Sequence, residues 1–335
     1  MFPAIASGGP RPPDPAARRP LGQTGLAVTP ICAGTSPLGS WAHHYGHDTS
    51  VEVALATLRA VLAGPFNYLD TSADYSAGEA ERRIGLAIRE AGGVPAGFVV
   101  QTKVDPDPVT GRFDGAAVRR SFEGSLGRLG MDRVPVLHFH DPERIPHAQA
   151  LARGGPVQEL AKIKAEGLAD HLGVAGGPAD LLSRYLDTGL FDVLISHNRW
   201  TLADRTADAL FDKAAAAGVG IVNAAPFGGG SLARGTATNP TYCYAPMPGP
   251  TLQAVRRVEA ICAAAGVPLG AAALQFSLRD PRIGSTIVGM ARPERVEQAL
   301  AWASWPIEDA VWRAVLDASG LDAGLPNHAD YLRLD

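Results

Sequence analysis

Four side chains in this sequence could exchange a proton or stabilise a charge during a reaction: Asp70, Tyr75, Lys103 and His140. A tyrosine hydroxyl is a weak acid with an ordinary pKa of about 10, and a neighbouring lysine ammonium stabilises its phenolate form. Asp70 could hold Lys103 in place, while His140 could donate a hydrogen bond to a substrate oxygen. The set suits interconversion of a carbonyl and an alcohol, in which Tyr75 exchanges a proton with the reacting oxygen.

Each residue taken alone has an ordinary explanation, such as a solvated loop aspartate or a histidine buried in a core. Their shared position predicts a site, because each lies at or just after the end of a short apolar run. Asp70 ends the second run, and Tyr75 follows five residues later within DTSADYSAGEAERRIG. Lys103 and His140 lie at the ends of the third and fourth runs.

The elements that must position these residues alternate regularly along the chain. Apolar runs that predict strands cover 29–36, 67–72, 98–104, 134–140, 169–176, 192–198, 220–226 and 284–290. Amphipathic stretches that predict helices cover 49–63, 78–91, 114–129, 155–166, 178–188, 204–217, 250–264 and 293–302. Eight strand–helix pairs favour a single α/β domain, a closed (β/α)8 TIM barrel whose site lies at the carboxyl ends of the strands. An open doubly wound sheet is the competitor, but its GxGxxG signature is missing from GTSPLGS after the first strand.

Composition narrows the class of protein further. The chain has 335 residues and a net charge of −4, so we expect no nucleic-acid partner. Its three cysteines are scattered, which argues against a disulfide framework and favours a reducing compartment. We expect residues 1–18 to be a flexible Pro-rich leader, 19–320 the barrel and 321–335 a tail. A β-hairpin over 19–30 should plug the barrel bottom, and 306–319 should form an extra C-terminal helix. No uninterrupted apolar segment is long enough for a membrane span, which predicts a soluble cytoplasmic protein.

The sequence around these residues resembles that of the aldo-keto reductase family. RPLGQTGLAVTPICAGTSPLG resembles its opening hairpin and first strand, NAAPFGGGSL its loop after strand seven, and GSTIVGMARPERVEQAL its cofactor segment. The resemblance covers roughly residues 19–302 and makes Asp70, Tyr75, Lys103 and His140 the catalytic tetrad. HFHDPER and NAAPFGGG look most like the branch holding L-fucose and D-threo-aldose 1-dehydrogenases, L-galactose dehydrogenase and pyridoxal 4-dehydrogenase. That branch implies oxidation of an aldose at C1 to the lactone, with reduction of a small aldehyde or oxidation of pyridoxal as the alternative.

The resemblance also implies NAD or NADP bound without a Rossmann motif. The residues expected to bind this cofactor are Gly34, Thr35, Ser36, Asp70, Ala175, Gly176, His197, Asn198, Phe227, Gly228, Gly230, Gly289, Arg292 and Arg295. Four positions depart from the family pattern: Ala175 and Gly176 stand where the family often has a Ser-Asn pair, His197 aligns with a glutamine, and Ala224 aligns with a stacking tyrosine. Gly289 stands where NADP-selective members commonly carry lysine, which favours NAD.

The substrate should be a small molecule, and the loop SWAHHYGHD should overhang the barrel mouth. We expect Trp41, His44 and Trp200 to contact it, because aromatic rings pack on sugars and pyridines. Two rival functions remain. His138 and His140 could form a metal pair of a hydrolase, although later strand ends offer few further ligands, so no metal is expected. The chain could also be a non-catalytic, cofactor-binding regulatory protein. The sequence leaves the oligomeric state open.

Overall fold

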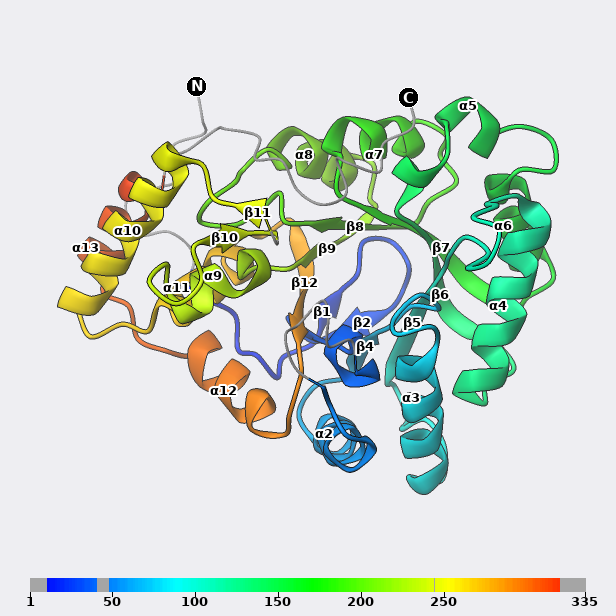
Figure 1. Ribbon diagram of the computed structural model, residues 1–335, viewed down its shortest axis with the longest axis horizontal. Coiled ribbons are helices and arrows are strands. Elements are labelled where there is room, and N and C mark those ends of the chain that lie inside the picture. Colours follow the sequence, from blue (N-terminus) through cyan, green and yellow to red (C-terminus); the bar gives the residue numbers. More distant parts are fainter. Residues whose placement is uncertain (1–10, 41–47, 244, 320–335) are drawn as a thin grey trace.

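The computed structural model describes residues 11–40, 48–243 and 245–319. Eight parallel strands close into a barrel in the order β12-β3-β4-β5-β6-β7-β8-β9 (Figure 1). The barrel strands are β3 (Ile31–Gly34), β4 (Tyr68–Asp70), β5 (Val99–Val104), β6 (Val134–His140), β7 (Ala169–Gly176), β8 (Val193–His197), β9 (Gly220–Ala224) and β12 (Ile283–Gly289). The predicted (β/α)8 TIM barrel is therefore confirmed.

Helices surround this barrel (Figure 1). They are α2 (Val51–Ala63), α3 (Glu79–Glu90), α4 (Gly115–Leu129), α6 (Pro156–Ala165), α7 (Ala179–Leu186), α8 (Asp208–Ala216), α10 (Gly249–Ala264), α11 (Leu269–Leu278), α12 (Glu294–Ala303) and α13 (Asp309–Ala318). The short elements of the loops are η1 (Ser36–Gly39), η2 (Pro142–Arg144), α5 (His147–Ala150), η3 (Gly228–Gly230), α9 (Ser231–Arg234), β10 (Thr241–Tyr242) and β11 (Ala245–Pro246). The extra C-terminal helix is α13, which packs against α10 at the periphery.

One helix was not predicted from the sequence. We expected 250–264 to be the helix before the last strand, but α11 occupies that position and packs against β12, α9 and α12. Every residue of α11 except Leu269 is buried, so the helix has no polar face and shows no amphipathic period. Pro268 caps its N-terminus, which explains why the proline and the glycines beside it suggested a broken segment.

The predicted N-terminal hairpin closes the barrel bottom. Its strands β1 (Arg19–Pro20) and β2 (Ala27–Val28) pair antiparallel. Leu21 and Val28 belong to the same apolar cluster as interior residues of the barrel strands. The turn approaches the start of β9 so closely that a Cβ on Gly22, whose φ is +56°, would lie 2.3 Å from the Gly220 nitrogen.

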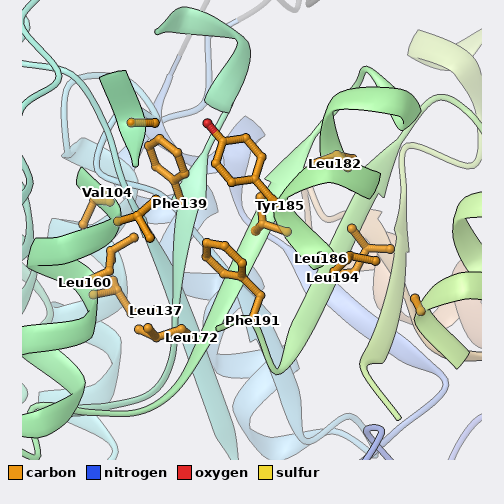
Figure 2. Close-up of a cluster of buried hydrophobic side chains, with 14 of the residues drawn as sticks. Val104, Leu137, Phe139, Leu160, Leu172, Leu182, Tyr185, Leu186, Phe191 and Leu194 are labelled. Atoms are coloured by element: carbon orange, nitrogen blue, oxygen red, sulfur yellow. The ribbon is translucent and has the colours of Figure 1, made fainter. Parts of the chain in front are cut away.

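The main core lies between the strands and the outer helices rather than inside the barrel. Figure 2 shows a cluster in this layer, in which the Phe139 ring packs edge-on against Tyr185 at 5.6 Å between centroids. Successive residues of a strand point to opposite faces. Burying Phe139 outside the barrel therefore directs His138 and His140 to its interior, where the site is built.

Within the described part of the chain, no single helix is long and apolar enough to cross a membrane. The helices α10 and α11 reach that length and composition only together, and they are bent by 108° relative to each other.

Candidate active site

A cavity of about 460 Å³ opens at the carboxyl ends of the barrel strands. Its wall includes all four predicted catalytic residues: Asp70, Tyr75, Lys103 and His140. Of the residues predicted to bind the cofactor, those in the wall are Gly34, Ser36, Asp70, Ala175, His197, Asn198, Phe227, Gly230, Gly289 and Arg295. Residues scattered along more than two hundred positions of the sequence therefore meet around one space.

Lys103 organises one side of this cavity. Its ammonium donates to Asp70 Oδ2 at 2.8 Å, to the Thr71 carbonyl at 2.8 Å and to the Tyr75 hydroxyl oxygen at 3.0 Å. An ammonium has three N–H donors, so these contacts use all of them and fix its orientation. Tyr75 sits in a tight turn whose next two residues have positive φ values of 53° and 54°. That turn packs on Gly39, where a Cβ would lie 2.4 Å from Ser76 Oγ.

Gln101 supports Asp70 from inside the barrel. Its amide nitrogen donates to Asp70 Oδ1 at 2.8 Å, and its amide oxygen faces the Tyr68 hydroxyl and His138 Nε2, the latter at 2.9 Å. Gln101 was not predicted from the sequence. It lies two residues before Lys103 on β5, so strand alternation could have placed both side chains on the inner face.

His140 is held by a second buried network. Its Nδ1 lies 2.6 Å from Asp105 Oδ1 and 3.1 Å from Ser72 Oγ. Burial alone would lower the pKa of His140, but the charges of Asp105 and Asp141 raise it above its ordinary value. Burial opposes ionisation of Asp105 too, yet the charge and hydrogen bond of His140 hold its pKa low. Asp105 and Ser72 were not predicted from the sequence, although Asp105 directly follows β5 and lies two residues after Lys103.

A polar wall continues beyond His140, formed by Asp74, Asp141, Arg144 and His197. The Arg144 guanidinium lies 3.2 Å from Asp74 Oδ2 and 3.7 Å from Asp141 Oδ2. His197 Nε2 lies 3.4 Å from Asp141 Oδ1. All four side chains line the cavity, so this wall offers both hydrogen-bond donors and acceptors to a bound molecule.

Asp141, Glu143 and His197 have donor atoms within 4.8 Å of one another, close enough to be considered as a metal site. Burial and the nearby charge of Asp141 raise the pKa of Glu143 well above its usual range, which makes this carboxyl group a poorer metal ligand than an ordinary glutamate. The Arg144 guanidinium and the His197 ring already contact the Asp141 carboxylate. We therefore assign no metal to this cluster. His138 and His140 bind different partners, Gln101 and Asp105, and do not converge on one point.

The far end of the cavity is cationic. Arg234 of α9 and Arg295 of α12 both line it, and neither has an acidic partner within 4.0 Å among the described residues. Burial lowers the pKa of Arg295, and the positive charges of Arg292 and Arg234 lower it further. Uncompensated guanidinium groups beside a wall of glycines fit the phosphates of a dinucleotide, since glycine leaves the backbone accessible. Arg234 was not predicted, because a single arginine in a Gly-rich loop carries no signal by itself.

Several predicted contacts lie elsewhere. The Thr35 hydroxyl donates to the Asp70 carbonyl at 2.8 Å and so holds the end of β4. Gly176 packs beside Glu143, Gly228 packs beside Tyr242, and the exposed Arg292 lies 3.8 Å from Glu294.

Of the three predicted substrate contacts, Trp200 lies in the described part of the chain, and it is not part of the cavity wall. Trp200 points into the layer between barrel and helices, with its ring centroid 5.7 Å from Phe211 and 5.4 Å from Phe276. Apolar partners on α8 and α11 account for that orientation, because burying the indole there removes it from water. Trp41 and His44 lie in residues 41–47, outside the described residues.

Comparisons with known proteins agree with this geometry. Residues 30–319 match the model of the aldo/keto reductase family. The chain is 29% identical to pyridoxal 4-dehydrogenase of Microbacterium luteolum, covering 91% of this chain and 97% of the relative. It is 32% identical to L-galactose dehydrogenase of Arabidopsis thaliana, covering 84% and 86%, and 29% identical to D-threo-aldose 1-dehydrogenase of a Pseudomonas species, covering 88% and 95%. An aldo-keto reductase from Bacillus halodurans in its holo form shares the fold, with a TM-score of 0.74, 19% identity, and coverage of 93% and 99%. With a family match over most of its length and a barrel of the same shape, this chain belongs to the aldo/keto reductase family.

Proposed function

We propose that this oxidoreductase oxidises an aldose at C1 to the lactone, using a nicotinamide cofactor. The observation that carries the proposal is the pairing of two features around one cavity. The Tyr75 hydroxyl lies 3.0 Å from the Lys103 ammonium, and the polar wall of Asp74, Asp141 and Arg144 begins beside it. The first feature suits proton exchange at an oxygen, and the second suits a substrate with several hydroxyl groups.

The residues divide the proton chemistry as follows. Tyr75 takes the proton of the C1 hydroxyl, because the adjacent Lys103 ammonium stabilises the phenolate that accepts it. Asp70, itself fixed by Gln101, keeps Lys103 in position. His140 donates a hydrogen bond to the substrate oxygen and orients it. When bound, a nicotinamide cofactor provides the acceptor for the hydride that leaves C1.

The cavity supports the cofactor assignment from both ends. Small or apolar residues, among them Ala175, Ala224 and Ile287, leave room for a flat ring in the cavity that Tyr75 also lines. Arg234 and Arg295 provide charge for phosphates at the other end. We propose NAD as the preferred form, since Gly289 has no side chain that could bring a cation to a 2′-phosphate.

The named relatives support this substrate class, because two of the three sequence relatives reported above are aldose dehydrogenases by name. Oxidation of pyridoxal is the second candidate, since the relative with that name matches along 97% of its length. A pyridine ring forms fewer hydrogen bonds than a sugar, so most donors and acceptors of the polar wall would have no partner on pyridoxal. We therefore rank the sugar first.

Absorbance of the reduced cofactor tests these assignments directly. The enzyme is mixed with NAD or NADP and then with L-fucose, L-galactose, D-arabinose or pyridoxal. Reduced cofactor formed with a sugar is the expected result, and the ratio of rates with NAD and NADP tests the role of Gly289. Formation with pyridoxal alone would select the second candidate. Oxidation of reduced cofactor by simple aldehydes, with no reaction of any sugar, would overturn the dehydrogenase proposal.

A further inference from the structure

The His140 ring lies between two carboxylates. Asp105 Oδ1 is 2.6 Å from Nδ1, and Asp141 Oδ1 is 3.7 Å from Nε2. Asp105 is buried, with 4% of its surface exposed, and His140 is 8% exposed. Of these two carboxylates, only Asp105 is within hydrogen-bond distance, so it accepts from Nδ1–H. The negative charge of Asp141 near Nε2 further favours a ring with a proton on both nitrogens. The short buried contact fixes the ring strongly at Nδ1 and leaves Nε2 toward the cavity.

The second oxygen of Asp105 is already saturated with donors. The Ser72 hydroxyl donates to Oδ2 at 2.5 Å, and the backbone N–H of Asp74 donates to it at 3.0 Å. Both donors come from the turn that carries Tyr75. Asp105 therefore connects the orientation of His140 to the turn that places Tyr75, through contacts that use both carboxylate oxygens.

We propose that Asp105 is a positioning residue that keeps His140 doubly protonated, with Nδ1–H bound to the carboxylate and Nε2–H presented to the substrate oxygen. This inference rests on the proposed function for the identity of that oxygen, but the protonation of His140 does not depend on it. In the oxidative direction, the hydroxyl proton moves to Tyr75, and a bound nicotinamide would accept the hydride from carbon. His140 keeps both of its protons and stabilises the negative charge that develops on the oxygen.

Other charged groups around His140 also affect how readily its ring is protonated. Asp141 adds a second negative charge, while Lys103 opposes protonation of the ring from the β5 side. Arg144 Nη1 lies 3.9 Å from Asp105 Oδ1 and offsets part of its charge. Asp105 is the one of these groups in hydrogen-bond contact with the ring, so its removal should change the protonation of His140 most.

The substitution Asp105→Asn tests the proposal without changing side-chain shape. Ser72 and the Asp74 N–H need an acceptor, so they should draw the amide oxygen to the Oδ2 position. The amide NH2 then faces His140 Nδ1 and requires a lone pair there. The variant ring should be neutral with its single proton on Nε2, and it should lose the charge while keeping a donor toward the cavity.

Nitrogen-15 NMR of the histidine ring, titrated with pH in the cofactor-free protein, measures this directly. We expect the pKa of His140 to fall by at least one unit in Asp105→Asn, which is about a tenfold loss in proton affinity. Asp107→Asn is the matched control, because Asp107 lies two residues further along the same loop and, among the described residues, its side chain bonds to its own turn and Arg120 rather than to His140. An unchanged His140 titration in folded Asp105→Asn protein would overturn the proposal.

A double-mutant cycle that combines Asp105→Asn with His140→Gln and measures kcat gives a second, independent readout. We expect Asp105→Asn to reduce kcat by about tenfold or more in the wild-type background. In the His140→Gln background it should change kcat by no more than about twofold, because Asp105 acts through a ring that is no longer there. Equal losses in both backgrounds would show that Asp105 supports only the fold. If no sugar or aldehyde is turned over, the proposed function fails, and the NMR titration still decides the role of Asp105.

Discussion

Replacing Tyr75 with phenylalanine removes one oxygen from the site. In the structure that oxygen accepts a hydrogen bond from the Lys103 ammonium at 3.0 Å. Lys103 keeps its two other acceptors, the Asp70 carboxylate and the Thr71 carbonyl, both at 2.8 Å. Tyr75 is half-buried and lines an open cavity, so water can take the place of the missing hydroxyl. We therefore expect the thermal stability of Tyr75→Phe to be close to that of the wild type.

The effect on catalysis should be much larger. General acid–base catalysis contributes about 10²–10⁴-fold, so we expect kcat to fall by that factor. This corresponds to about 2.7–5.5 kcal/mol in the activation free energy. The Kd of the cofactor should change little, because the phenol oxygen lies on the Lys103 side of the cavity rather than at its cationic end. Steady-state absorbance of reduced cofactor gives kcat, and quenching of tryptophan fluorescence gives the Kd.

Tyr185→Phe is the matched control, because its buried hydroxyl has no hydrogen-bond partner in the described structure and lies in the outer core. It should leave kcat and the cofactor Kd unchanged. A Tyr75→Phe enzyme that is folded, binds cofactor normally and retains wild-type kcat would refute the proton-transfer role. A comparable loss of kcat in Tyr185→Phe would show instead that the assay reports general damage.

Three further outcomes follow from the same geometry. Gln101→Leu leaves the Tyr68 hydroxyl and His138 Nε2 without their buried partner, and each orphaned group costs about 1–3 kcal/mol, so urea unfolding should show a clear loss of stability. Arg295→Gln removes a charge-assisted contact of about 1.5–3 kcal/mol, so the cofactor Kd should rise about 10–100-fold with kcat nearly unchanged; an unaltered Kd would place the phosphates elsewhere. Phe139→Ala opens a cavity in the outer core and should destabilise the protein by about 3–5 kcal/mol, measured by denaturant unfolding, without altering the cofactor Kd.

Much of the fold could be predicted because local sequence patterns carry it. The period of two in VPVLHFH puts Phe139 on one face of β6 and His138 and His140 on the other, whatever surrounds the strand. Alternating strands and helices favoured a barrel, and a barrel gathers the carboxyl ends of its strands. The positions of Asp70, Lys103 and His140 at those ends therefore followed from the sequence.

The failures share a physical cause. The helix α11 is buried on all sides, so it has no polar face from which a helical period could be recognised. Trp200 was expected at the cavity, but apolar partners from α8 and α11 draw it into the outer layer. Burial depends on which elements pack together, and these packing partners cannot be inferred from a single sequence.

The sequence by itself determined which residues could carry the proton chemistry and at which end of the barrel they lie. Only the tertiary structure decided what each of them contacts. β5 and β6 are neighbours in the closed barrel, and this places Asp105 against His140 although 35 positions separate them. Gln101 reaches Asp70 in the same way, from β5 to β4. Hydrogen bonds act over about 3 Å, so partners distant along the chain are chosen by strand order and register rather than by spacing in the sequence.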